Sequence, residues 1–347
     1  MTTLVTGATG FVGSHVARLL AARGESVRVL TRSARRPPGA VDVLAGIPVD
    51  RAEGDLRDRF SLEAALCGVR CVYHVAADYR LWSANPAEIY DSNVQGTRNL
   101  LEAARASGVE KFIYTSTVAT IAVHRPGQLP DETTQASYED MVGHYKLSKF
   151  LAEQEALRVA RGGFPVIIVN PTTPVGPGDW KPTPTGRIIL DFLNGKMPAY
   201  VDTGLNVVAV EDVAAGHLLA AERGKPGERY LLGGRNMTLK EILDALAQIS
   251  GRRSPRVRLP HAVAMVAAYA DTIFSRALGR EPRIPVEGVR IARHKMFVDC
   301  SKAERDLGYR AQPVPAALER AVHWYEENGY VTGRAGIARA AHSQEAA

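Results

Sequence analysis

The chain has 347 residues, 46% of them hydrophobic and 23% charged, and its formal net charge is +6. This is an ordinary globular composition, with enough apolar residues for the core of one large domain or two smaller ones. Arginine is dispersed along the chain and forms no run, so we expect solvated charged faces and no nucleic-acid partner.

The first half of the chain alternates short apolar segments with segments of helical periodicity. The predicted strands are residues 3–6, 26–31, 50–53, 71–75, 111–116 and 165–170. The predicted helices are residues 11–23, 61–66, 86–107 and 138–161. This alternation is typical of β-α-β units, so we expect an α/β fold with a Rossmann doubly wound parallel sheet over residues 1–170.

The second half of the chain differs in texture. It opens on five closely spaced prolines, Pro171, Pro174, Pro177, Pro182 and Pro184. Patterned segments follow at residues 207–222, 228–232 and 239–249. Such a stretch suits a pocket built from loops, so we expect a smaller substrate-binding α/β part at 171–330, with elements at about 207–232 returning to the first domain. We expect residues 331–347 to form a flexible tail.

Three glycines, Gly7, Gly10 and Gly13, lie in TGATGFVG, between the first predicted strand and the first predicted helix. Glycine permits a tight turn there and lets the backbone approach a pyrophosphate, which the free amides of the helix N-terminus attract. We therefore expect this loop to bind a dinucleotide cofactor. The predicted contacts are Gly7, Thr9, Gly10, Phe11 and Val12.

The choice of cofactor is expected at the end of the second strand, in VRVLTRSARR. An acidic residue there would bind the ribose 2'-hydroxyl of NAD, but this chain has Arg32, followed by Arg35 and Arg36. Arginine matches phosphate geometry, so the sequence predicts NADP as the preferred cofactor, or NAD if these arginines are only solvated. Further predicted contacts are Asp55 and Leu56 near the adenine, and Val75, Ala76 and Ala77 beneath the cofactor.

Tyr145 and Lys149 lie one helical turn apart in Y-x-x-x-K, on one face of a predicted helix. The ordinary tyrosine pKa is about 10, too high for proton transfer at neutral pH. An ammonium about 4 Å away contributes roughly 4 kcal/mol, which would lower that pKa by on the order of three units. A hydroxyl in YTSTVAT could polarise the substrate oxygen. We predict Thr117 for this role, with Ser116 as the neighbour that could replace it.

These motifs appear in a characteristic order, together with GDL, HVAA, NVQGT, YKLSK and NPTTPVGPGD. Over almost the whole chain the pattern resembles the extended short-chain dehydrogenase/reductases, the NAD-dependent epimerase/dehydratase family. More narrowly, HVAADYRLW, GHYKLSKFLAE, KPTPTGRII and MPAYVDTGLN resemble the bacterial proteins called hopanoid-associated sugar epimerase and the dihydroflavonol 4-reductases.

The resemblance implies roles for individual residues. Thr117, Tyr145 and Lys149 would be catalytic, and Asn93 in NVQGT would support the site. Pro171 and Thr172 would flank the nicotinamide. Thr117 occupies a position where many relatives have serine, and its hydroxyl can serve equally.

The leading interpretation is a reductase or dehydrogenase that moves a hydride between the nicotinamide and a carbonyl or alcohol carbon of a small molecule. An alternative is a sugar-nucleotide epimerase or dehydratase that retains NAD, where Arg283, Arg290 and Arg293 could meet a diphosphate. A third reading is a non-catalytic nucleotide-sensing protein on the same fold. Relatives pair through their long helices, so a homodimer or a monomer is expected.

The remaining features exclude other classes of protein. Cys67, Cys71 and Cys300 form no even disulfide framework, and neither they nor the nine histidines have zinc-ligand spacing, so we expect reduced thiols and no metal. No secretory signal is visible, which predicts a cytoplasmic protein. The longest apolar run, residues 262–270, is far short of the ~20 residues of a bilayer span. It could instead be a lid over a lipid-like substrate or an ordinary buried helix.

Overall fold

A seven-stranded parallel sheet forms the centre of the computed structural model, which describes residues 2–33, 41–121, 127, 129–280 and 282–332. The strand order is β10-β6-β5-β4-β1-β2-β3, with every neighbouring pair parallel. The strands are β1 Thr2–Thr6, β2 Ser26–Thr31, β3 Val49–Glu53, β4 Val69–His74, β5 Lys111–Thr115, β6 Val166–Pro171 and β10 Arg229–Leu232. The predicted doubly wound α/β fold is confirmed.

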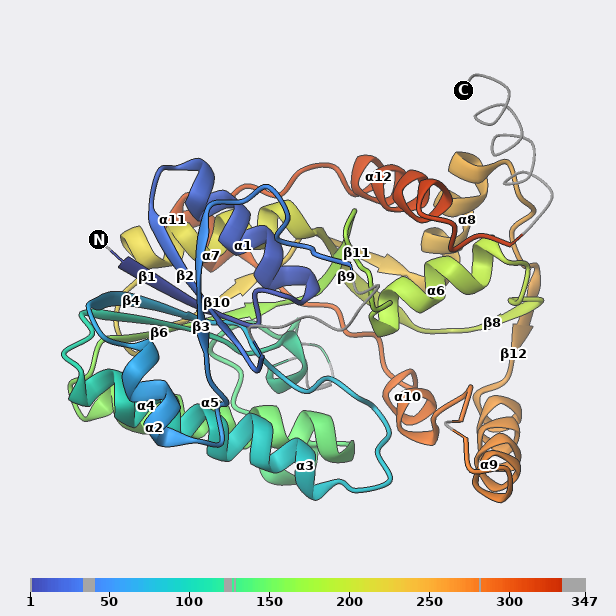
Figure 1. Ribbon diagram of the computed structural model, residues 1–347. Coiled ribbons are helices and arrows are strands. Elements are labelled where there is room, and N and C mark those ends of the chain that lie inside the picture. Colours follow the sequence, from blue (N-terminus) through green and yellow to red (C-terminus); the bar gives the residue numbers. More distant parts are fainter. Residues whose placement is uncertain (1, 34–40, 122–126, 128, 281, 333–347) are drawn as a thin grey trace.

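Helices cover both faces of this sheet (Figure 1). One face carries α1 Phe11–Ala22, α7 Val210–Arg223 and α11 Ser301–Leu307, and the other carries α2 Arg59–Ala65, α4 Gly96–Ala106 and α5 Gly143–Arg161. Alternate residues of a strand point to opposite faces, so Ile167 packs in the core under α1 and α7, while Ile168 packs under α4 and α5. Burial on both faces explains why β6 is an unbroken apolar run.

The strand order reverses between β1 and β4. From β1 the chain proceeds outward through β2 and β3, then returns to build β4, β5, β6 and β10 on the other side. In open parallel sheets, ligands bind at such a switch point, beyond the carboxyl ends of the strands. The segments that follow β1, β4, β5 and β6 meet at this edge.

Smaller sheets and a third core follow β6. A three-stranded sheet contains β7 Thr173–Val175, β9 Gly204–Ala209 and β11 Arg235–Thr238, and a two-stranded sheet pairs β8 Ala199–Val201 with β12 Val257–Leu259. The third core lies between α6 Pro184–Leu193, α8 Leu239–Ser250 and α12 Val314–Glu327. Two further helices, α9 His261–Ala277 and α10 Val286–Ile291, pack against each other at one end of the molecule (Figure 1).

Two helices that were predicted as unbroken runs are interrupted in the structure. The helix predicted at 86–107 is α3 Ala87–Tyr90, a π-helical turn at Asp91–Gln95 and then α4. The helix predicted at 138–161 begins as a 3-10 turn, Tyr138–Asp140, and restarts at Gly143, whose positive φ of 86° breaks the run. Both interruptions lie next to predicted site residues, since Asn93 is in the π-helical turn and Tyr145 is two residues after Gly143.

The apolar run at 262–270 falls within α9, and the expectation of an ordinary buried helix is wrong. Val266 is 70% exposed and Ile273 is 71% exposed. Among the described residues, no helix is both long and apolar enough to cross a membrane. Arg35, Arg36 and nearly all of the predicted tail lie outside the described residues.

Candidate active site

The glycine loop after β1 is held in a conformation that only glycine fits. Gly7 has a φ of +70°, and a Cβ atom there would lie 2.6 Å from the backbone nitrogen of Ala76, in the segment after β4. The amide of Gly10 donates to the carbonyl of Gly7 at 2.8 Å, and a Cβ on Gly13 would collide with that same carbonyl oxygen. The two loops at the switch point are therefore in direct backbone contact.

The N-terminus of α1 opens onto this loop. Its N-cap residue, Gly10, offers no side-chain cap, and the first turn contains no acidic residue. Amides at a helix N-terminus that lack a side-chain cap attract an anion, and the helix dipole adds to that attraction. Thr9 and Gly10 are exposed, and Phe11 and Val12 are partly so. The backbone of this loop therefore fits the pyrophosphate of a dinucleotide.

Charged side chains gather where β2 and β3 end. Arg32 is exposed directly after β2. The carboxylate of Asp55 accepts from Arg57, from Nε at 2.9 Å and from Nη2 at 2.6 Å. These bonds to Arg57 lower the pKa of Asp55 to about 2, and the charge of Arg32 contributes. Sequence reasoning missed Arg57, although an aspartate commonly accepts from the backbone amide two residues on, as Asp55 does here from Arg57 at 2.9 Å.

The floor of the site is a chain of buried hydrogen bonds. The His74 ring is hydrogen-bonded to Thr6 Oγ1 at 2.7 Å and to Thr97 Oγ1 at 3.0 Å. The amide of Ala76 donates to Thr6 Oγ1 at 3.2 Å, which fixes the predicted cofactor-contacting run from Val75 to Ala77. Burial lowers the pKa of His74 to about 3, so the ring is neutral and holds the loop in place.

Thr117 and Tyr145 meet at the carboxyl edge of the sheet. Thr117 directly follows Ser116 after β5, and its Oγ1 accepts from the amide of Ala119 at 3.2 Å. That acceptance leaves the hydroxyl hydrogen free to donate, and the Thr117 side chain acts on the Tyr145 phenol, where it opposes the rise in pKa that burial causes. The Ser116 hydroxyl is buried without a hydrogen-bond partner among the described residues. Of the two predicted hydroxyls, Thr117 is therefore the one beside the tyrosine.

Lys149 lies in a different environment from the one expected. Its ammonium donates to Tyr114 Oη at 3.0 Å and to the carbonyl of Thr115 at 2.8 Å. Burial lowers the pKa of Lys149 to about 7, against the opposing charge of Glu153. The expected lowering of the Tyr145 pKa by this lysine is wrong for this structure. Burial raises the pKa of Tyr145 and the Thr117 hydrogen bond opposes that rise.

A buried acid behind Lys149 ties the surrounding loops together, and sequence reasoning missed it. Glu153 is 1% exposed and accepts from Thr120 Oγ1 and Asn170 Nδ2, each at 2.9 Å. Arg229 of β10 compensates its charge at 3.2 Å. Asn170 also donates to the carbonyl of Thr117 at 3.1 Å. The signal in the sequence was the acid one turn beyond the lysine.

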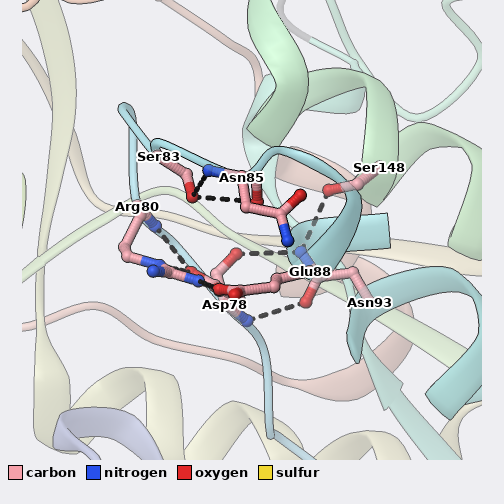
Figure 2. A network of polar contacts seen from close by, with 7 residues as sticks. All are labelled: Asp78, Arg80, Ser83, Asn85, Glu88, Asn93 and Ser148. Atoms are coloured by element: carbon pink, nitrogen blue, oxygen red, sulfur yellow. Dashed lines mark hydrogen bonds and ion pairs between the residues drawn. The ribbon is translucent and has the colours of Figure 1, made fainter. Parts of the chain in front are cut away.

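Asn93 supports the tyrosine helix from the side (Figure 2). Its Oδ1 accepts from the amide of Asp78 at 2.7 Å, and its Nδ2 donates to the Asp78 carbonyl at 2.8 Å and to Ser148 Oγ at 3.0 Å. Ser148 in turn donates to the carbonyl of Tyr145 at 2.8 Å. The π-helical turn that carries Asn93 thus joins the loop after β4 to the first turn of α5.

The outer side of that loop is tied down by charge. The carboxylate of Asp78 binds Arg80 at 2.6 Å, and Arg80 also binds Glu88 of α3 at 3.0 Å (Figure 2). These groups are exposed or partly exposed, so each pair contributes little to stability by itself. Together, these ion pairs hold in place the backbone of Asp78, to which Asn93 is hydrogen-bonded.

The other predicted contacts lie at the same edge. Pro171 ends β6, and the amide of Thr172 donates to the carbonyl of Leu232 at 3.1 Å. Leu56 follows Asp55 after β3, and its carbonyl accepts from Asn99 at 2.9 Å. The structure therefore brings the glycine loop, the hydroxyl pair and these contacts to one edge of the sheet.

We expect the unusual position of Lys149 to change how stability depends on pH. Its pKa in the folded protein is about 7. An unfolded lysine titrates near 10.4, so above pH 7 the unfolded state binds a proton that the folded state has lost. The contribution of Lys149 to the free energy of unfolding therefore rises with pH, by at most about 1.4 kcal/mol per pH unit between pH 7 and 9.

The measurement compares urea unfolding of the wild type and Lys149→Met at pH 7 and pH 9. The free energy of unfolding should rise more steeply with pH in the wild type than in Lys149→Met, because other titrating groups are common to both. Lys196→Met, at an exposed lysine, is the matched control and should keep the wild-type slope. Equal slopes in wild type and Lys149→Met would show that Lys149 stays charged.

Similarity to known proteins agrees with this geometry. The profile of the NAD dependent epimerase/dehydratase family matches residues 3–233. A protein of Synechocystis sp. provisionally named dihydroflavonol 4-reductase is 46% identical over 331 residues, which are 94% of this chain and 95% of that protein. Sterol demethylase protein B of Methylococcus capsulatus is 37% identical over 333 residues, 95% of this chain and 100% of its own. The crystal structure of gox2253 is similar with a TM-score of 0.84 and 47% identity, covering 95% of this chain and 99% of that one.

Proposed function

Because the chain belongs to the NAD-dependent epimerase/dehydratase family of extended short-chain dehydrogenase/reductases, we propose that this enzyme is a reductase or dehydrogenase acting on a carbonyl or alcohol carbon. The observation that supports this choice is the placement of Thr117 beside Tyr145 at the carboxyl edge of the sheet. The pair lies at the same edge of the sheet as the glycine loop. A cofactor bound to that loop would therefore be close to the proton donor.

In this proposal Tyr145 is the proton donor. A bound nicotinamide supplies the hydride for reduction of a carbonyl carbon, or accepts it in the reverse reaction. Burial keeps the Tyr145 phenol protonated, so it can donate its proton to the substrate oxygen as negative charge develops there. Thr117 orients that oxygen with its free hydrogen, and solvent restores the proton on Tyr145.

Lys149 has two roles in the same proposal. With a pKa of about 7 it can be neutral or charged at working pH, and its hydrogens would bind the ribose hydroxyls of the cofactor. Its bonds to Tyr114 and to the carbonyl of Thr115 also hold α5 against β5, which fixes the helix that carries Tyr145. Asn93 acts indirectly. It donates to Ser148, which donates to the carbonyl of Tyr145, so it holds the turn of α5 that carries the tyrosine.

We propose NADP as the preferred cofactor, since Arg57 binds the carboxylate of Asp55 and the charge of the exposed Arg32 acts on the same group. The expected result is that Arg32→Gln raises the Kd for NADPH about tenfold and leaves the Kd for NADH nearly unchanged, because charge-assisted bonds contribute about 1.5–3 kcal/mol. Fluorescence titration measures both constants. Arg105→Gln, at an exposed arginine of α4, is the control and should change neither. An equal effect of Arg32→Gln on both nucleotides would remove this residue from 2'-phosphate recognition.

The second candidate function is an epimerase or dehydratase that retains NAD, with an association with hopanoids. The description of the matching family supports the epimerase or dehydratase reaction, and the association with hopanoids rests on the sequence resemblance alone. The first experiment is therefore to look for cofactor that co-purifies with the protein, and then to titrate NAD(H) and NADP(H). Exchangeable NADPH binding would support the reductase, and stoichiometric trapped NAD would favour the epimerase.

We propose that residues 171–330 mainly bind the substrate, while β10 and α7 complete the cofactor-binding domain. The relatives named for dihydroflavonol reduction and sterol demethylation favour an apolar ring compound as substrate. The cytoplasm is the proposed location, since Cys67, Cys71 and Cys300 are free thiols.

A further inference from the structure

The outer face of α9 is apolar throughout. Between Ala262 and Ser275, every exposed residue of this helix is apolar or aromatic. The large ones are Val263, Val266, Tyr269, Ile273 and Phe274, with exposed fractions from 46% to 71%. Their spacing places them along one side of a helix about 25 Å long.

Apart from the partly buried Met265, the inner face of the same helix is built from small and polar residues. Ala268 and Ser275 are fully buried, and Thr272 Oγ1 donates to the carbonyl of Ala268 at 2.8 Å. The carboxylate of Asp271 accepts from the amide of Ile284 at 2.8 Å, and the His261 ring bonds the carbonyl of Val289 in α10 at 2.6 Å. A surface helix ordinarily turns its large apolar side chains inward, so α9 has the reverse polarity.

The positive charge of the protein is concentrated in the stretch of sequence that contains this helix, although Arg258 and Lys295 of that stretch pair with Asp202. Residues 252–295 hold ten arginines and lysines against three aspartates and glutamates, while the whole chain has 43 against 37. The rest of the chain therefore holds 33 against 34, which is close to neutral. The expectation of dispersed charge is wrong for this segment. The excess was missed because the arginines are spread among apolar residues and form no long run.

Two of these cations contact the apolar face, and two more are exposed nearby in the sequence. Arg290 of α10 donates to Tyr269 Oη at 2.9 Å, and the Arg280 guanidinium lies 5.4 Å from the centre of the Phe274 ring. Arg283 and Arg293 are exposed, and within the described residues neither forms an ion pair. Aromatic rings and arginines at the border of an apolar face suit the boundary between lipid tails and headgroups.

We propose that α9 docks the protein on an anionic membrane surface, with its apolar face among the acyl chains and the surrounding arginines against lipid phosphates. Figure 1 shows α9 at the lower right, beyond α10, separated in this view from the helices that cover the sheet. A second copy is a poorer partner for this face, because a two-fold contact would bring two segments of strong positive charge together. The contact is reversible, since a single interfacial helix does not insert.

The test is co-sedimentation of the full-length protein with lipid vesicles. One set contains phosphatidylcholine alone, and the other equal parts of phosphatidylcholine and phosphatidylglycerol. We expect partition onto the anionic vesicles to exceed partition onto the neutral ones at least about tenfold. The double variant Val266→Ser/Ile273→Ser should lose about tenfold of the anionic partition, because both lost side chains are apolar. Arg283→Gln/Arg293→Gln should lose about tenfold as well.

Matched controls lie on the opposite part of the molecule. Phe60 of α2 is 84% exposed, so Phe60→Ser removes an exposed apolar side chain elsewhere, and Arg105→Gln removes an exposed charge elsewhere. Both should partition like the wild type. Each α9 variant changes only exposed side chains, and nucleotide titration verifies that it is folded whatever the outcome for catalysis.

Two outcomes would overturn the proposal. One is partition that is absent, or that is the same for the wild type and the Val266→Ser/Ile273→Ser variant. The other is light scattering that shows a dimer which this variant converts to a monomer, since a second copy would then cover α9. Neither outcome bears on Tyr145, so failure of the docking proposal is distinct from failure of the proposed reaction.

Discussion

Replacing Tyr145 with phenylalanine is expected to lower kcat by about 10²-fold or more, with nucleotide affinity nearly unchanged. The substitution removes one hydroxyl, which is the group beside Thr117 that carries the proton in the proposed reaction. The ring remains, so the packing of α5 is preserved. Steady-state kinetics with NADPH and a carbonyl substrate measure the first effect, and fluorescence titration measures the second.

Tyr138 provides the matched control, because it is 59% exposed in the 3-10 turn just before α5. Tyr138→Phe should keep wild-type turnover. Full activity in Tyr145→Phe would exclude Tyr145 as the acid. Thr117→Ser should retain most of the activity, whereas Thr117→Val should lose it, since the proposal needs the hydroxyl and not the methyl group.

Gly7→Ala is expected to abolish nucleotide binding, with an increase in Kd of at least about 10²-fold. The positive φ of Gly7 disfavours alanine by roughly 1 kcal/mol. The larger effect comes from the added Cβ, which would lie 2.6 Å from the backbone nitrogen of Ala76. The loops after β1 and β4 must then separate, and the N-terminus of α1 moves away from the pyrophosphate position.

The variant Gly24→Ala separates the effect of a positive φ from the effect of a colliding Cβ atom. Gly24 has a similar φ of +78°, but a Cβ there would meet nothing within 4 Å. This variant should lose a little stability in urea and keep its affinity for nucleotide. If Gly7→Ala binds nucleotide as tightly as Gly24→Ala, then the contact between the two loops is not what shapes the cofactor site.

Local patterns in the sequence were sufficient for the sheet and for the residues around its edge. Strand alternation, the glycine loop and the Y-x-x-x-K spacing are properties of neighbouring residues, because backbone geometry fixes which side chains share a face. The predicted bounds of α1 and β2 accordingly agree with the structure to within one residue. The breaks beside Asn93 and Gly143 were missed, because a helical pattern continues through a π-helical turn and a flexible glycine.

The partner of each charged group was decided only by the tertiary structure. The sequence placed Lys149 one turn from Tyr145, but whether its ammonium faces that phenol depends on Tyr114 and Thr115 of β5, more than 30 residues away. Glu153 likewise owes its burial to Arg229, 76 residues later. The exposure of the α9 face has the same origin, since an apolar run reads alike whether or not the fold covers it. Sequence alone thus determined which chemical groups are present and which backbone carries them. The fold determined their solvation and their neighbours, and these set the pKa of each group and the surface left open to a partner.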